Sequence, residues 1–201
     1  VSANTALTLL ACYGNDLTSL DVSGATALNE LHCENNQLTS LDVNNNIALG
    51  YFSCAHNQLT SLDVSNNIAL GYFSCAHNQL TSLDVSNNTN LEYLECNDNQ
   101  LTSLDARNGN NSNTFPFEVT NNPNLTCINV DNVAWSNANW TNIDPQHYFS
   151  NNCTPSAIQE HTTNKELLKV TDLLGREIKG TNQPLFYIYD DGTVEKRIVI
   201  E

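Results

Sequence analysis

The sequence predicts a mainly β solenoid of 21-residue coils with parallel strands, followed by a small antiparallel β domain. Three observations support this prediction. Leucines recur every 21 residues through the first half of the chain, which indicates a stack of repeated units. The composition then changes, because residues 1–153 hold 14 acids and one base, whereas residues 154–201 hold 8 acids and 6 bases. A cysteine keeps the same 21-residue step at Cys12, Cys33, Cys54, Cys75 and Cys96.

The overall composition excludes some functions. The chain has 201 residues and a formal net charge of −15 at pH 7. A strongly acidic surface repels phosphate backbones, so nucleic acid is not an expected partner. No apolar run approaches the roughly 20 residues that a membrane-spanning helix needs. Because the sequence has no methionine, we expect a processed form or part of a longer protein.

Residues 1–107 repeat one internal pattern. It reads L-x-x-L-x-C-x-x-N-x-L in residues 28–38 and L-D-V-x-N-N in residues 41–46. Alternate residues such as Leu31 and Cys33 point inward from a short strand, and their neighbours point outward. The pattern resembles the leucine-rich repeat family. That resemblance implies a solenoid in which each coil buries its leucines against the adjacent coils.

The other parts of the repeat lead to further predictions. The string L-T-S-L-D-V favours a second strand or extended segment on the opposite side, and no helix. The recurring asparagine, for example Asn36, is expected to bond backbone groups where the chain turns. In-register parallel neighbours point their side chains the same way, which is poor disulfide geometry. The five repeat cysteines are therefore expected to be free, buried thiols.

Residues 108–153 are expected to form a degenerate repeat and a C-terminal cap. A loop rich in Gly, Asn and Ser at 108–114 interrupts the period. We assign residues 117–119 to the L-D-V places of the unit. Residues 125–130 then take the L-x-x-L-x-C places, with Val130 where the cysteine had been.

This assignment puts Cys127 on an outward-facing position, away from the other cysteines. Its expected disulfide partner is Cys153, the other cysteine outside the row, and such a bond fits an oxidising location. The segment from 122 to 153 is similar to the terminal cap of secreted leucine-rich repeat proteins of Bacteroidetes. Covering an open solenoid end requires bulk, which we assign to Trp135, Trp140, Ile143, Tyr148 and Phe149.

Residues 154–166 are interpreted as a linker, and residues 167–201 as a small β domain. The strings K-V-T-D-L-L-G-R-E-I-K, from 169 to 179, and P-L-F-Y-I-Y-D-D-G-T-V-E-K-R-I-V-I, from 184 to 200, resemble the C-terminal targeting domain of type IX secretion substrates. That resemblance implies recognition by an outer-membrane shuttle barrel and removal by a sortase-like peptidase. The protein would then reach the extracellular space or outer-membrane surface of a Gram-negative bacterium. The signal residues are assigned to Gly175, Arg176, Tyr187, Asp191, Gly192 and Lys196.

Stacking of the coils turns equivalent positions into columns on the strand face. One column contains three tyrosines, and histidines and acids flank it. Rigid tyrosines are typical of binding surfaces, although stacked aromatic side chains also stabilise adjacent strands. The expected ligand-binding residues are Tyr51, Tyr72, Tyr93, His32, His56, His77 and Glu95.

Two histidines one coil apart are too few ligands for a closed zinc site, so no metal site is predicted. The aspartates at Asp21, Asp42, Asp63, Asp84 and Asp105 are interpreted as a solvated face rather than a weak calcium site. No catalytic motif is present, and the cysteines face the core, so neither an enzyme nor a cofactor is expected. The sequence predicts a secreted or surface-displayed binding protein for a protein or glycan. The alternative is a structural subunit of an outer-membrane complex.

Overall fold

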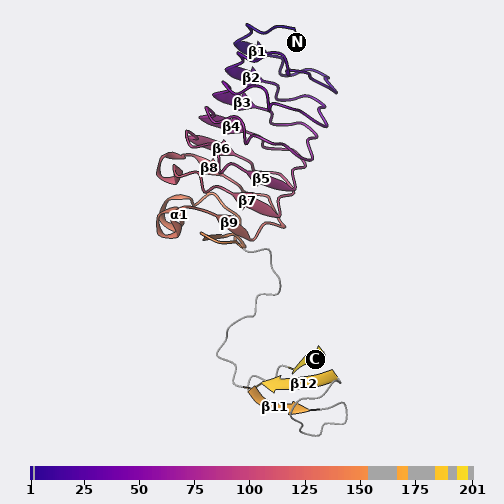
Figure 1. The fold of residues 1–201 in the computed structure, drawn as a ribbon, viewed down its shortest axis with the longest axis vertical. Coiled ribbons are helices and arrows are strands. Elements are labelled where there is room, and N and C mark those ends of the chain that lie inside the picture. Colours follow the sequence, from indigo (N-terminus) through magenta and orange to yellow (C-terminus); the bar gives the residue numbers. More distant parts are fainter. Residues whose placement is uncertain (2, 154–166, 172–183, 190–193, 199–201) are drawn as a thin grey trace. The chain divides into compact units, whose positions relative to one another are not determined.

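The computed structural model describes residues 1, 3–153, 167–171, 184–189 and 194–198. The chain divides into two compact units, Val1–Cys153 and Thr154–Glu201. The first unit is a solenoid of stacked coils, and the second contains a small antiparallel sheet (Figure 1). The fold class predicted from the sequence is therefore confirmed. We number the coils 1 to 5 by their cysteines, from Cys12 to Cys96, and call the next turn coil 6.

One parallel sheet, the strand face, runs the length of the solenoid with one short strand from each coil. From β1 to β6 each strand pairs with its neighbour 21 residues away, so that Tyr51 lies beside Tyr72 and Phe52 beside Phe73. In-register pairing therefore places equivalent residues in columns. The strands are β1 (Leu9–Ala11), β2 (Glu30–His32), β3 (Tyr51–Ser53), β4 (Tyr72–Ser74), β6 (Tyr93–Glu95) and β8 (Phe117–Glu118).

A second parallel sheet lies on the opposite side, as the L-T-S-L-D-V pattern predicts, but it forms only toward the C-terminal end of the solenoid. The same string at 38–43 and 59–64, in coils 2 and 3, carries no strand. The side is therefore strand-like in coils 4 to 6 and extended without ladder pairing before them. Its strands are β5 (Ser82–Asp84), β7 (Ser103–Asp105), β9 (Cys127–Asn129) and β10 (Tyr148–Ser150), in the order β10-β9-β7-β5.

The core between the two sides is a narrow column of apolar side chains. Most leucines, the phenylalanines of coils 3 and 4 and the cysteines of coils 2 to 5 are fully buried, while Leu62 and Cys12 are only half-buried. All five repeat cysteines are free thiols. Burial raises the pKa of the Cys33 thiol, and it does the same for the other repeat cysteines. These thiols pack in the core as small apolar side chains and are not activated nucleophiles.

One buried asparagine per coil joins each coil to the previous one. The Asn57 amide donates to the carbonyls of Cys54 and Cys33, both at 3.0 Å, and its oxygen accepts the Leu38 N–H at 2.9 Å. The expected bonding of the turn is thus confirmed, and it reaches further than predicted because it spans two coils. The same pattern is formed by Asn36, Asn78, Asn99 and Asn122.

A second asparagine column lies in the turn that follows L-D-V. The Asn67 amide donates to the carbonyl oxygens of Val43 and Asn46 in the preceding coil, at 3.0 and 2.9 Å. Sequence reasoning noted this N-N pair but assigned it no role. The column therefore fixes the other end of each coil; its members are Asn46, Asn67 and Asn88, all fully buried.

The sequence-based phase of coil 6 is wrong. Phe117 pairs with Leu94, which puts residues 117–119 in the L-x-C places, with Val119 at the cysteine position. Ile128 pairs with Leu104, so residues 125–130 take the L-D-V side. The two halves of a repeat share the spacing L-x-x-L-x-(C/V), so apolar spacing alone does not identify the half.

The cap begins with helix α1 (Val133–Asn139). A short 3-10 turn, η1 (Asn111–Asn113), lies earlier in the chain, before β8. The buried Trp140 ring stacks on Phe117, with 3.8 Å between ring centroids, and its indole N–H donates to the Thr114 carbonyl at 2.9 Å. Trp135 and Phe149 contact Trp140 edge-on. Tyr148 does not contribute bulk as expected, because it is exposed.

A disulfide joins Cys127 of β9 to Cys153, with 5.7 Å between their Cα atoms. It connects the last coil to the end of the cap. Both residues lie at the outer surface of the second sheet, since Cys127 is half-buried while its neighbour Ile128 is fully buried. The pairing is the one that the sequence led us to expect.

The second unit contains a three-stranded antiparallel sheet of β11 (Leu167–Thr171), β12 (Pro184–Tyr189) and β13 (Val194–Ile198), in that order. Of the proposed signal residues, Tyr187 belongs to β12 and Lys196 to β13. The others, Gly175, Arg176, Asp191 and Gly192, lie outside the described residues. Within the described part of the chain, no helix is both long and apolar enough to cross a membrane.

Replacing Asn57 with alanine should lower the free energy of unfolding by about 3 kcal/mol, because the buried Leu38 N–H loses its acceptor and the Cys33 and Cys54 carbonyls each lose one of two asparagine donors. Denaturant titration measures the change. The control is Gln58→Ala at the adjacent exposed position, which should cost less than about 0.5 kcal/mol. Equal losses of stability in the two variants would contradict the role of Asn57 in joining adjacent coils.

Thiol titration of the denatured, unreduced protein should find five free thiols, with Cys127 joined to Cys153. In the native protein, alkylation should modify half-buried Cys12 first and leave the buried thiols unmodified. Mass spectrometry of fragments produced by cleavage after glutamate and aspartate identifies each modified residue, because acidic residues separate the five cysteines in the sequence. A bond between Cys33 and Cys54 would show that the coils are not in register.

Candidate binding surface

The first residue of three successive strands is a tyrosine that points away from the core. Tyr51, Tyr72 and Tyr93 open β3, β4 and β6, and the next residue of each strand is buried. The rings stack with centroids 4.1 Å apart and interplanar angles of 5° and 18°. The sequence-predicted column is therefore one continuous tyrosine ladder.

The ladder presents neutral hydroxyl groups. Burial against neighbouring side chains raises the pKa of the Tyr51 and Tyr72 hydroxyls to about 12, and burial also raises the pKa of Tyr93. Each ring is half-buried, so the hydroxyl keeps its proton at neutral pH while its tip stays near solvent. The ladder can both donate and accept hydrogen bonds.

His32 and Glu95 lie at opposite ends of the ladder. The His32 ring contacts the Tyr51 ring, with centroids 4.5 Å apart, and its Nε2 lies 3.7 Å from the Glu30 carboxylate. At the other end, Glu95 accepts a 2.7 Å hydrogen bond from the Ser74 hydroxyl. Both residues therefore belong to the same surface as the tyrosines.

His56 and His77 form a separate column at the turn after each strand. Their rings stack at 4.1 Å, and His77 Nε2 lies 3.5 Å from the Asp98 carboxylate. These positions have left-handed backbone conformations, with φ of 54° at His56 and 52° at His77. Sequence reasoning missed this requirement, although the equivalent residues Gly14, Asn35, Asp98 and Asn121 are types that tolerate it.

Small side chains separate the tyrosine ladder from the histidine pair. Ser53 and Ser74 follow the buried phenylalanines in β3 and β4, and Ala55 and Ala76 follow the cysteines. All four are buried. The middle of the strand face thus has two aromatic columns with small residues between them.

The strand face is acidic at both ends. Glu30 and Glu34 lie in coil 2, and acids recur at Glu92, Glu95, Asp98 and Glu118 in coils 5 and 6. Among residues 1–153 the only lysine or arginine is Arg107, which pairs with Asp105 on the opposite side. The face therefore carries carboxylates without a compensating lysine or arginine of its own.

The strand face does not assemble a metal centre. His56 and His77 have Asp98 nearby, but no group of three or more histidine, cysteine, aspartate or glutamate side chains suited to a metal ion occurs in the described ranges. Neither aromatic column converges on a shared point, because in-register stacking keeps side chains parallel. The surface suits contact with a ligand along its length.

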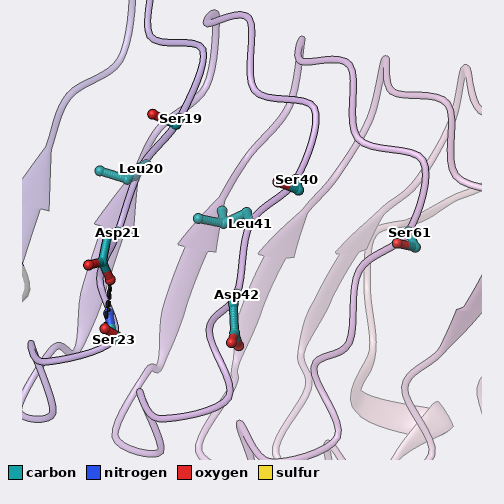
Figure 2. A pocket seen from close by; sticks show the side chains of 8 residues that line it. All are labelled: Ser19, Leu20, Asp21, Ser23, Ser40, Leu41, Asp42 and Ser61. Atoms are coloured by element: carbon teal, nitrogen blue, oxygen red, sulfur yellow. Dashed lines mark hydrogen bonds between the residues drawn. The ribbon is translucent and has the colours of Figure 1, made fainter.

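On the opposite side, the aspartates form turns. The carboxylates of Asp42, Asp63 and Asp84 each accept the backbone N–H two residues later, at 2.8 to 2.9 Å. Hydrogen bonds from Ser65 lower the pKa of Asp63. A shallow hollow of about 480 Å³ opens over coils 1 to 3, where strand pairing is absent. Figure 2 shows its lining, which includes Ser19, Leu20, Asp21, Ser40, Leu41 and Asp42.

Solved structures share this architecture. The functional domain of InlJ from Listeria monocytogenes, described as including a cysteine ladder, matches with a TM-score of 0.55 and 30% identity over 75% of this chain. An internalin, InlF, from the same species matches with a TM-score of 0.50 and 21% identity over 77% of this chain. A leucine-rich repeat protein of Leptospira interrogans has a TM-score of 0.48, with 18% identity over 73% of this chain.

The match covers only part of those proteins. The chain spans 36% of the InlJ chain, 44% of the InlF chain and 49% of the Leptospira chain. No protein-family model matches the sequence, and no curated protein sequence matches it. The parallel coils of about 21 residues, together with the two Listeria structures, show that the solenoid has the leucine-rich repeat fold.

Proposed function

We propose that this chain is a non-enzymatic binding protein that holds a protein or glycan partner against the strand face. The observation that carries the proposal is the ladder of Tyr51, Tyr72 and Tyr93, which lies on the outer surface of the strand face beside the small residues of coils 3 and 4. Stacked tyrosines lose little conformational entropy on binding, because their neighbours already restrict their rotation. A preorganised aromatic row of this kind favours tight contact.

The chemistry of the side chains supports binding over catalysis. The cysteines of coils 2 to 5 are buried, with raised pKa, so they are poor nucleophiles. The three histidines of the strand face, His32, His56 and His77, stack on each other or on tyrosine, and their ion-pair contacts are with Glu30 and Asp98 rather than with a nucleophile. The face offers contact area, hydroxyls and carboxylates.

We further propose that the C-terminal unit directs export. The resemblance of residues 167–201 to type IX targeting domains supports recognition by an outer-membrane shuttle barrel, followed by cleavage by a sortase-like peptidase. The disulfide between Cys127 and Cys153 is consistent with an oxidising compartment. The solenoid would then act outside the cell or on the outer-membrane surface of a Gram-negative bacterium.

Replacing Tyr51, Tyr72 and Tyr93 together with serine should weaken partner binding by about 2 kcal/mol or more, because three aromatic anchors are lost. The measurement is quantitative mass spectrometry of outer-membrane proteins and glycans recovered on the tagged chain. Thermal melting of the same variant reports how much the ladder contributes to stability.

The matched control is Asp42→Asn, Asp63→Asn and Asp84→Asn on the opposite side, which should leave recovery unchanged. If the tyrosine variant recovers its partner normally but melts much earlier, the ladder is structural and the binding proposal is wrong. A stable stoichiometric membrane complex that survives the tyrosine change would favour the structural-subunit alternative.

Deleting residues 167–201 should trap the protein in the periplasm while the solenoid stays folded, since the solenoid is a compact unit of its own. Immunoblots of culture supernatant and periplasm, with protease resistance of the retained protein, measure both effects. Fusing residues 154–201 to an unrelated periplasmic protein should export it. Unchanged secretion of the truncated chain would refute the export role.

A further inference from the structure

The column next to the cysteines on the strand face contains two polar atoms without a partner. Glu34 and Asn97 each follow the buried cysteine of their coil by one residue, in coils 2 and 5. The Glu34 Oε2 and the Asn97 Oδ1 atoms are buried and make no hydrogen bond. Both atoms are hydrogen-bond acceptors. A donor from outside the solenoid is needed to satisfy each of them.

These two acceptors are unlike the other unpaired atoms in the described residues. The remaining four belong to Asn46, Asn67, Asn88 and Ser136, which are fully buried inside the protein. Glu34 and Asn97 are only half-buried. Because the terminal torsion of a carboxylate or amide is soft, a small rotation turns either oxygen toward solvent. A ligand on the strand face can therefore reach them.

The charge around both acceptors favours a cationic donor. Glu30 accompanies Glu34 in coil 2, and the Asp98 carboxylate lies beside Asn97, whose amide donates to it at 2.6 Å. Glu95 lies on the same coil as Asn97, two residues before it. Ammonium and guanidinium groups carry several donors and no acceptor, which matches the unpaired Glu34 and Asn97 oxygens and the carboxylates beside them.

The tyrosine ladder argues against a sugar as the main ligand. The negative face of an aromatic ring is where C–H groups or a cation bind. Both faces of Tyr72 are covered by its neighbours, and Tyr51 lies between Tyr72 and His32. The ladder therefore offers ring edges and hydroxyls, which suit the amides and side chains of a polypeptide.

The spacing of the two acceptor sites defines the ligand further. Glu34 and Asn97 are three coils apart, or about 14 Å at roughly 4.8 Å per parallel strand. An extended polypeptide covers that distance in about four residues, and residues i and i+4 of an extended chain point to the same side. Between the two sites the face carries only small residues, Ala55 and Ala76, in this column.

We propose that the strand face binds an extended protein segment with two lysine or arginine side chains four residues apart. The segment runs along the column from Glu34 to Asn97, between the tyrosine ladder and the histidine pair. One basic group pairs with Glu30 and Glu34, and the other with Glu95, Asn97 and Asp98. This inference rests on the proposed binding role of the face and names the chemical class of its partner.

The test uses the full chain and a synthetic nine-residue peptide, capped at both ends, with lysines at positions 3 and 7 and valine, threonine and serine elsewhere. Isothermal titration at 50 mM salt should detect saturable binding with one peptide per chain. Changing both lysines to glutamine, or raising salt to 500 mM, should weaken binding at least tenfold. Moving the second lysine to position 4 should weaken it similarly, because that side chain points away.

The protein variant is Glu34→Gln with Glu95→Gln, and its control is Asp42→Asn with Asp63→Asn, which changes the net charge equally on the opposite side. The first should lose at least tenfold in affinity, and the second less than twofold. Melting temperatures confirm that both variants are folded. Equal losses, or no binding of the lysine peptide to the wild-type chain, would overturn the inference.

The same measurements separate this inference from the broader proposal. If the tyrosine-to-serine variant loses its outer-membrane partner while neutral oligosaccharides, and not the lysine peptide, bind the wild-type chain, the binding role holds and the cationic segment is wrong. If the tyrosine variant keeps its partner, the strand face is not the binding surface and both ideas fail.

Discussion

The hydrogen bonds of one asparagine per coil hold the register on which the rest of the solenoid depends. Asn57 bonds the carbonyls of two successive cysteines and one leucine N–H, and its equivalents do the same, with Val119 in place of a cysteine at Asn122. A coil that slipped by one residue would lose all three bonds and turn its leucines outward. Because the register is maintained, tyrosine stacks on tyrosine and histidine on histidine, and the surface columns exist at all.

The two sides of the solenoid use this register differently. On the strand face, backbone pairing continues from β1 to β8, so that side chains are held at regular spacing. On the aspartate side, strands form only from coil 4 onward, and a hollow opens over coils 1 to 3. The aspartates there are engaged in turns through their own backbone. A regular array of outward side chains is therefore available only on the strand face.

Much of the fold follows from the sequence because a fixed period fixes the pairing partner. Once Cys33 and Cys54 are equivalent, so are Leu31 and Phe52, and the inward and outward residues of each strand follow. The disulfide between Cys127 and Cys153 also follows, since both cysteines lie outside the period. The tyrosine ladder was found in the same way.

Other features of the fold could be identified only from the structure. The phase of coil 6 was misassigned because Leu125, Ile128 and Val130 fit either half of the repeat. The spacing of Asn122 does not separate the halves either, since both C-x-x-N and V-x-N-N place an asparagine three residues later. Its hydrogen bonds to the Cys96 and Val119 carbonyls identify the correct half. The sequence did contain a signal for the left-handed turns at His56 and His77, because Gly14 and asparagines occupy the equivalent positions of other coils. No sequence signal indicates the unpaired oxygens of Glu34 and Asn97, because hydrogen bonding depends on atomic positions that the spacing of residues does not encode.

The identity of coils 3 and 4 has a consequence for how this surface changes over generations. Residues 50–67 and 71–88 have the same sequence, so a duplication or loss of 21 residues leaves every asparagine bond intact. Each such event lengthens or shortens the neutral middle of the strand face by one strand spacing, roughly 4.8 Å. The acidic ends are carried apart or together without being altered. A change in the number of repeats would therefore alter the distance between the acidic ends in discrete steps, without any change to the contacts within a coil.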